Sequence, residues 1–262
     1  MTTLTRPDAR LHFEVRGSGP LVALVGAPMD ADAFAPLAEL LATDHTVLTT
    51  DPRGVHRSVL ADPDTDSTPA QRADDLAALI TEVDAGPAAV LGSSGGAVTA
   101  LALAQRHPEL VRTVVAHEPP LDELLPDRES LRTRTDAMCE AYLAGDVVGA
   151  WAEFFALASI EMPPGVVEQM FGGERDPQQV ADERYWFAHE LRPSVRFLPD
   201  VEALRGSRVV LGIGADSTGQ LCDRATRALA AQLDVEPVLF PGGHIGFADD
   251  AASFAPTLKP YL

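Results

Sequence analysis

Residues 88–104 read AAVLGSSGGAVTALALA, and this stretch carries most of the information about the architecture of the chain. Its apolar start predicts a buried strand, its glycine-rich middle a very tight turn, and its alanine- and leucine-rich end a helix. The turn matches G-x-S-x-G with Ser94 at its centre, a strand–turn–helix arrangement that presents a serine nucleophile. Only glycine-sized neighbours let the strand and the helix approach closely at such a turn.

The helix that is predicted after Ser94 places the positive end of its dipole beneath the serine. The backbone N–H of Gly95, the next residue, can then face an oxyanion that develops during reaction at an acyl carbon. An ordinary glycine-rich turn between a strand and a helix would match the same pattern. The interpretation therefore depends on residues elsewhere in the chain.

Predicted strands and helices alternate on both sides of this stretch. Apolar or alternating runs predict strands over residues 10–16, 21–25, 46–50, 111–116, 208–213 and 236–240. Segments between them predict helices, for example over residues 70–83 and 218–233. This alternation is typical of an α/β fold with a mostly parallel central sheet and helices on both faces. Residues 1–120 and 205–262 form the expected core.

The alternation stops between residues 121 and 204, where we predict helices only. The expected helical segments cover residues 130–143, 147–159 and 177–190. The stretch holds nine of the fifteen aromatic residues, including Trp151 and Trp186, so a small core of its own would use most of them. We expect a helical cap inserted into the core, over the carboxyl edge of the sheet where ligands bind. The pocket beneath it should be apolar.

The amino-acid composition limits the kinds of partner that the protein is expected to bind. The 262 residues have a formal net charge of −19, which disfavours nucleic acid and anionic membrane surfaces. The first ten residues lack the apolar core of a signal peptide, so we expect a cytoplasmic protein. Cys139 and Cys222 lie far apart and lack metal-ligand spacing, so we expect no metal or redox role for them. The serine chemistry that Ser94 indicates implies neither a metal nor an organic cofactor. The expected partner is a small-molecule substrate, and both a monomer and a homodimer remain open.

A serine hydroxyl becomes a nucleophile when a base takes its proton, and an acidic residue must hold that base. His244 is the strongest candidate base, because it follows the last predicted strand in the glycine-rich stretch PGGHIGF. It is also the last of the seven histidines, which fits serine, acid, histidine, one of the chain orders in which such triads occur. His117, at a predicted strand end, is a lesser candidate.

Two carboxylates remain open as the acidic residue. Asp216 lies just past the predicted strand 208–213 and precedes His244 along the chain, with room for one helix and one strand between them. Glu118 lies at the end of the strand predicted at residues 111–116, which follows the helix after Ser94. It is therefore also at the carboxyl edge. We favour Asp216. A second oxyanion donor is expected after residues 21–25, where Ala27 has an N–H and the following proline has none.

Taken together, these residues resemble the α/β-hydrolase superfamily, and the resemblance covers almost the whole chain. Four stretches carry it in this order: GAP at 26–28, DPRGVHRS at 51–58, GSSGG at 92–96 and PGGH at 241–244. The resemblance implies an α/β-hydrolase fold with a cap, in an esterase- or lipase-like member. It also implies that Ser94 is the nucleophile, His244 the base, and Ala27 and Gly95 the oxyanion donors.

The chain departs from the family's usual motifs at three places. Val25 stands where the family usually has a histidine, and His56 replaces the second glycine of D-x-R-G-x-G-x-S. In the usual G-x-x-D acid motif, Ser217 stands at the acid position, which is why Glu118 remains an alternative. Haloalkane dehalogenase and epoxide hydrolase members use an aspartate as nucleophile, so the serine here disfavours their chemistry.

The sequence thus predicts a serine hydrolase that cleaves a small to medium hydrophobic carboxylic ester, thioester or lactone through an acyl-enzyme. The same residues would also serve acyl transfer, C–C bond hydrolysis or cofactor-free perhydrolysis. A protein that keeps the fold and binds a ligand without turnover is the alternative from a different class.

Overall fold

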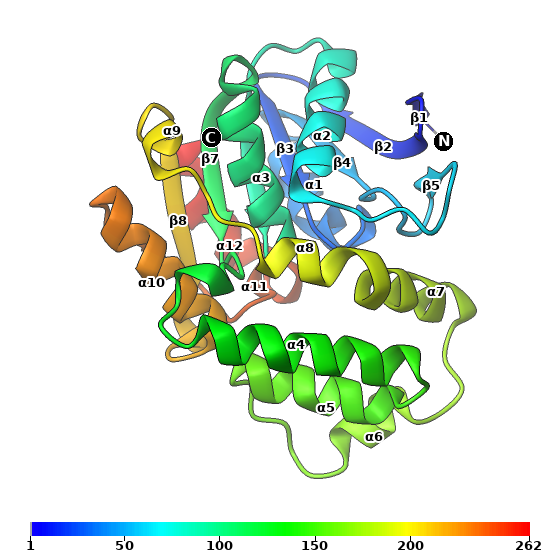
Figure 1. Cartoon of the computed structure of the whole chain (residues 1–262). Coiled ribbons are helices and arrows are strands. Elements are labelled where there is room, and N and C mark those ends of the chain that lie inside the picture. The colour runs from blue at the N-terminus through cyan, green and yellow to red at the C-terminus, as the bar shows by residue number, and fades with distance from the viewer. Residues whose placement is uncertain (1) are drawn as a thin grey trace.

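The structure, a computed structural model, describes residues 2–262 (Figure 1). Met1, with which the expected core range begins, lies outside the described residues. The described residues form a nine-stranded sheet in the order β1-β2-β4-β3-β6-β7-β8-β9, with β5 paired to β2. The strands are β1 (Thr2–Thr5), β2 (Ala9–Gly17), β3 (Leu21–Val25), β4 (Thr46–Thr50), β5 (Val59–Leu60), β6 (Ala88–Ser93), β7 (Val111–His117), β8 (Val209–Gly214) and β9 (Val238–Phe240).

The central strands are parallel, and β6 lies between β3 and β7. In this register Val25 pairs with Gly92, and Ser93 pairs with His117. The carboxyl ends of these three strands therefore meet at one edge of the sheet. Every residue of β3 and β6 is buried, as the continuous apolar runs in the sequence predict for strands covered on both faces.

Helices cover both faces of the sheet. One hydrophobic cluster joins α2 (Pro69–Val83), α3 (Gly95–Arg106) and α10 (Leu221–Leu233) to the first face. A second cluster joins α1 (Ala35–Leu41), α11 (Gly246–Asp249) and α12 (Ala251–Leu258) to the opposite face. The second cluster includes stacked rings of Phe34 and Phe247, with centroids 4.4 Å apart. This is the α/β-hydrolase fold that the sequence predicts.

The chain between β7 and β8 is helical, and residues 121–204 contain no strand. In Figure 1 its first helices lie together beyond one end of the strands, whereas the last one returns beside the core. No helix among residues 2–262 has the length and apolar character that a membrane crossing requires. The helices are α4 (Arg128–Leu143), α5 (Val147–Ala158), α6 (Val166–Phe171), α7 (Pro177–Tyr185), α8 (Leu191–Val195) and α9 (Val201–Arg205), with a π-helical segment, Trp186–Glu190, between α7 and α8.

The structure contains several short elements that the sequence analysis did not predict. They include β1, whose residues are mostly exposed, and the single-turn helices α6, α8 and α9. Helix α10 begins at Leu221 and not at the expected residue 218, because a 3-10 turn and Gly219, with φ of 83°, precede it. These differences lie outside the central strands, so they leave the predicted edge of the sheet in place.

Candidate active site

Ser94 occupies the turn between β6 and α3 with φ of 56° and ψ of −126°. This backbone conformation is unfavourable for a residue with a side chain, and such residues concentrate at functional sites. The neighbouring glycines make the turn possible. A Cβ on Gly92 would overlap the carbonyl group of Gly96, and a Cβ on Gly96 would overlap the carbonyl oxygen of Val25. The predicted tight approach of strand and helix is therefore present.

Ala27 and Gly95, the two expected oxyanion donors, line the same cavity as Ser94. Gly95 is the first residue of α3, so its N–H has no acceptor within the helix. Ala27 follows β3 and is 2% exposed. Within residues 2–262, neither N–H donates a hydrogen bond to the protein. A Cβ on Gly95 would lie 2.5 Å from the carbonyl oxygen of Ala27, so only glycine lets the two segments meet this closely.

His244 is held by a buried carboxylate. Its Nδ1 donates to Oε2 of Glu118 over 2.5 Å, and the other carboxylate oxygen accepts from the backbone N–H of Gly214 over 2.8 Å. The Glu118 side chain is fully buried, whereas His244 is 27% exposed. Because Nδ1 carries the proton, the neutral imidazole has its basic nitrogen at Nε2. This is the tautomer that a general base for a serine requires.

The Glu118 carboxyl is ionised despite its burial. Burial alone would raise its pKa, but the hydrogen bond and the positive charge of His244 outweigh this effect and hold the pKa of Glu118 below its usual value. Its backbone has φ of 53°, in the left-handed region, as Ser94 has. The other non-glycine residues with positive φ, apart from His56, end helices: Asp84, Ser159 and Asp234. At the carboxyl edge of the sheet, positive φ values of non-glycine residues thus occur at the serine, at the carboxylate and at His56.

The structure corrects our preference for Asp216 as the partner of His244. Asp216 lies in the 3-10 turn after β8, where it is exposed, and its backbone N–H donates to the carbonyl of Gly242 over 3.0 Å. Its side chain has no hydrogen bond or ion pair within residues 2–262, and the carboxylate that reaches His244 belongs to Glu118. The reason is local: the backbone of Gly214 already binds Glu118, and the chain then turns outward.

His117, the lesser candidate base, is a core residue. It is fully buried, and its ring packs edge-on against Phe240 and Phe254. Burial lowers its pKa to about 4, with Glu118 opposing and His244 adding to the shift. It is therefore neutral at physiological pH. Its Nδ1 lies 3.2 Å from Oγ of Ser93, and it does not line the cavity.

A cavity of about 390 Å³ lies between the core and the cap. Ser94, His244, Ala27 and Gly95 form its floor on the core side. The aromatic side chains of the cap pack against one another, and Trp151 stacks on Phe171 and Trp186 at 4.3 and 5.6 Å. The cap contributes mainly apolar side chains to the cavity, among them Met138, Phe154, Phe155, Leu157, Trp186 and Val195.

Comparisons with known proteins place the chain in a family. A family model described as alpha/beta hydrolase fold matches residues 19–147. The hydrolase YraK of Bacillus subtilis strain 168, itself uncharacterised, is 32% identical over an alignment 275 positions long. The alignment covers 99% of this chain and 95% of YraK. The chain belongs to the α/β-hydrolase family. Its class of enzyme is therefore hydrolase.

Two further comparisons extend this result. A zearalenone hydrolase of Bionectria ochroleuca is 26% identical to this hydrolase over an alignment 271 positions long. The alignment covers 97% of this chain and 94% of that protein. The solved structure of Est816, described as an N-acyl homoserine lactone degrading enzyme, superposes with a TM-score of 0.74 over the whole of both chains, at 16% identity. At that identity the likeness to Est816 shows the fold alone.

The hydrolase also has a buried arginine that the sequence analysis did not identify. Arg72 of α2 is 3% exposed and donates to Thr99 of α3 over 2.9 Å and to Ser194 of α8 over 2.8 Å. It also donates to the carbonyl and hydroxyl groups of Ser67. Thr99 in turn donates to the carbonyl of Gly95 over 3.1 Å. The arginine thus connects the cap to the helix that follows Ser94.

Glu190 of the π-helical segment lies near this arginine and is fully buried. Neither of its carboxylate oxygens has a hydrogen-bond partner among the described residues. Burial raises the pKa of Glu190 to about 7, and the charge of Arg72 opposes the shift. No signal in the sequence marks either residue, because a charged residue in an amphipathic helix usually belongs to the exposed face.

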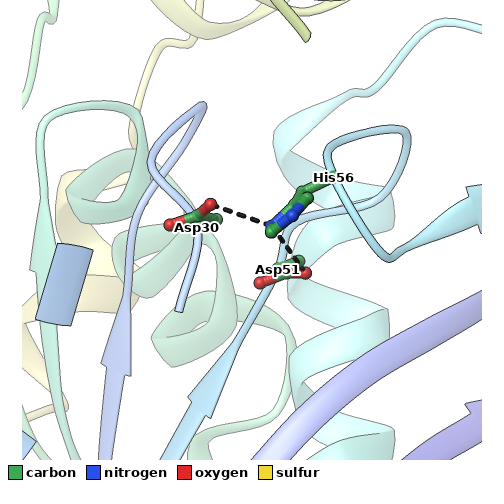
Figure 2. Close-up of side chains that lie close together, drawn as sticks. All are labelled: Asp30, Asp51 and His56. Atoms are coloured by element: carbon green, nitrogen blue, oxygen red, sulfur yellow. Dashed lines mark ion pairs between the residues drawn. The ribbon is translucent and has the colours of Figure 1, made fainter. Parts of the chain in front are cut away.

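Asp30, Asp51 and His56 form the one group of side chains in residues 2–262 whose spacing would suit a metal ion (Figure 2). Nδ1 of His56 lies 3.0 Å from Asp30 and 3.6 Å from Asp51. However, the guanidinium of Arg57 binds both oxygens of Asp51, over 2.7 and 2.8 Å. A cation already occupies this carboxylate, so the group is an ion-pair cluster in the loop that carries the unusual His56.

Proposed function

We propose that the protein is a serine hydrolase that cleaves a small to medium hydrophobic carboxylic ester, thioester or lactone. One observation carries the proposal: Ser94, two unpaired backbone N–H groups and His244 line the same cavity, and the buried Glu118 holds His244. Serine, base and acid then have the roles of a catalytic triad, and Ala27 and Gly95 those of the oxyanion donors. The apolar cap supports a substrate with hydrophobic surface.

In the proposed mechanism, Nε2 of His244 takes the proton of the Ser94 hydroxyl as the oxygen attacks the acyl carbon. The N–H groups of Ala27 and Gly95 donate to the oxyanion, each lowering the barrier by about 3 kcal/mol. His244 then protonates the leaving oxygen or sulfur, and the acyl group stays on Ser94. In the second half, His244 deprotonates a water molecule that releases the acid and restores the serine.

Glu118 acts on the histidine throughout. Its ionised carboxylate keeps the proton of His244 on Nδ1 and stabilises the imidazolium that forms at each proton transfer. The hydrogen bond from Gly214 fixes the orientation of the carboxylate. The cavity volume of about 390 Å³ lies within the range of small-molecule pockets, which agrees with a substrate of modest size. The relative named as a zearalenone hydrolase supports the same general chemistry.

Intact-mass measurement after treatment with a fluorophosphonate tests this proposal. We expect one covalent adduct on the wild type and none on Ser94→Ala. Glu118→Gln should react far more slowly than the wild type, whereas Asp216→Asn, the matched carboxylate control, should react at the wild-type rate. A folded wild type that forms no adduct would refute the serine mechanism and favour the ligand-binding alternative.

A further inference from the structure

Among the described residues, Asp122 is the one acidic side chain that lines the cavity of this hydrolase. It begins a short 3-10 turn, Asp122–Leu124, between β7 and the cap. This turn packs against α4 of the cap and α10 of the core. Only 4% of the residue is exposed. A carboxyl group is therefore enclosed in a wall whose other members are mainly apolar.

The carboxyl of Asp122 has no partner within residues 2–262. Its Oδ1 is buried without a hydrogen bond, and the side chain takes part in no ion pair. The nearby arginines pair with other carboxylates: Arg224 binds Asp127 over 2.6 Å, and Arg132 binds Glu123. Burial raises the pKa of Asp122 to about 7, with Glu123 and Asp127 adding to the shift and Arg224 opposing it. Native proteins rarely leave a buried polar group unpaired unless it has a further role.

Three other polar side chains of the cavity wall have hydrogen-bond partners or proposed roles, and the remaining ones, Thr135, Gln220 and Cys222, are uncharged. Ser94 and His244 belong to the proposed triad. Ser194 accepts a hydrogen bond from Arg72 and donates to the carbonyl of Glu190 over 2.8 Å. Asp122, by contrast, contributes nothing to the protein's own hydrogen bonds through its side chain. Asp122 lines the space that a substrate would fill.

We propose that Asp122 binds a hydroxyl group of the substrate and thereby determines which hydrophobic ester or lactone the enzyme accepts. A carboxyl group accepts a hydrogen bond from a hydroxyl in either protonation state, whereas a methyl group at the same place leaves it unpaired. Sites that hydrogen-bond one substrate group reject the analogue that lacks it more strongly than apolar pockets do. The substrate class is therefore an apolar ester or lactone with a hydroxyl group remote from the scissile bond. This inference rests on the proposed esterase function.

Matched substrates test the inference. One series contains p-nitrophenyl esters whose acyl chains, of four to eight carbons, end in a hydroxyl group; in the other, a methyl group replaces the hydroxyl. We expect the wild type to prefer the hydroxyl ester at one or more chain lengths. In Asp122→Leu the ratio of the two kcat/KM values should fall by about tenfold. Asp122→Asn should keep part of the preference, and Glu123→Gln, the matched neighbour outside the cavity, all of it.

Three results would overturn the inference: no preference in the wild type at any chain length, an unchanged ratio in Asp122→Leu, or a stronger preference for the corresponding amino ester. The unfolding temperature, Tm, distinguishes a structural role of Asp122 from a role in substrate binding. Replacing an unpaired buried carboxyl by leucine should raise Tm; a lower Tm with an unchanged ratio would mean that Asp122 serves stability. Asp122→Ala replaces the leucine variant if that variant does not fold.

Binding to Ser94→Ala distinguishes failure of this inference from failure of the proposed function. The fluorescence of Trp186, which lines the cavity, reports binding of the ethyl esters of the same acyl chains. A hydroxyl preference that is present in Ser94→Ala and lost in Ser94→Ala with Asp122→Leu supports the role of Asp122 even if the wild type hydrolyses no ester. Absence of that preference refutes the role of Asp122 even if fluorophosphonate labels Ser94.

Discussion

Glu118 and Glu190 are both fully buried glutamates, but only Glu118 has hydrogen-bond partners. Glu118 lies at the sheet edge, where His244 and the backbone of Gly214 bind one oxygen each. Glu190 lies at the junction of cap and core, where the nearest cation, Arg72, is already bound to Ser67, Thr99 and Ser194. The same side chain at the same depth therefore has opposite pKa shifts. Partners, more than depth, determine whether a buried carboxyl is ionised.

The largest effect is expected from Glu118→Gln. Without the carboxylate, the histidine loses its tautomer and the support for its charged form, so kcat should fall by about 10³- to 10⁴-fold. Asp216→Asn should stay within about twofold of the wild type, because Asp216 does not contact the histidine. Ester hydrolysis with circular dichroism as a folding control measures both. Equal losses in the two variants would refute the assignment of the acid.

A large loss of stability is expected from Arg72→Met. The variant removes charge-assisted hydrogen bonds to Ser67, Thr99 and Ser194 and leaves these groups buried. The expected decrease in the free energy of unfolding is about 4.5 kcal/mol, at about 1.5 kcal/mol for each of the three residues that lose the arginine. Arg106→Met is the matched control, because its pair with Asp74 is half exposed and should contribute less than about 1 kcal/mol. Urea unfolding measures both.

Glu190→Gln should make stability less dependent on pH. The folded-state pKa of Glu190, about 7, lies above the ordinary glutamate value of 4.5. The native state therefore holds the proton more tightly, so wild-type stability falls as pH rises from the lower value to the higher. The variant should be more stable than the wild type at pH 8, by about 3 kcal/mol, and close to it at pH 4. A difference that is constant over this pH range would contradict the assignment.

The smallest effect is expected at another carboxylate–histidine contact, Asp30 with His56. Both side chains are partly exposed, 26% and 29%, unlike the buried carboxylate of Glu118. Asp30→Asn should change the free energy of unfolding by less than about 1 kcal/mol. Because Arg57 already neutralises Asp51, neither EDTA nor added Zn²⁺ should shift Tm of the wild type. A Tm that falls in EDTA would show that a metal ion binds there.

Sequence reasoning predicted the fold, and it named four residues that the structure brings to one cavity, because both depend on short local patterns. The strand, turn and helix around Ser94 are encoded within residues 88–104, and the positions of Ala27, Gly95 and His244 follow from adjacent strand ends. All of them line the cavity. Parallel strands meet at one edge, so a correct reading of the strands suffices to bring such residues together.

The partner of His244 could not be chosen in this way. Glu118 and Asp216 both follow strands that end at the same edge, so strand positions favour neither. The choice depends on the left-handed backbone of Glu118 and on the N–H of Gly214, which hold the Glu118 carboxylate in the interior. Asp216 stays exposed. Arg72 and Glu190 were missed for a related reason. Their burial results from docking of the cap on α2 and α3, which no local pattern encodes.

The cap is one continuous segment of the chain, and both of its ends lie beside the site. The cap leaves the core just after Glu118 and returns just before β8, whose residues 209–212 pair with residues 114–117 of β7. The backbone of Glu118 donates to Gly212 and its side chain accepts from Gly214, so the two ends of the insertion are joined on the core side. We expect that a cap of different length or sequence could be exchanged between these strands while the histidine keeps its carboxylate. Such an exchange would change the apolar side chains over the cavity and leave Ser94, His244 and Glu118 on the core.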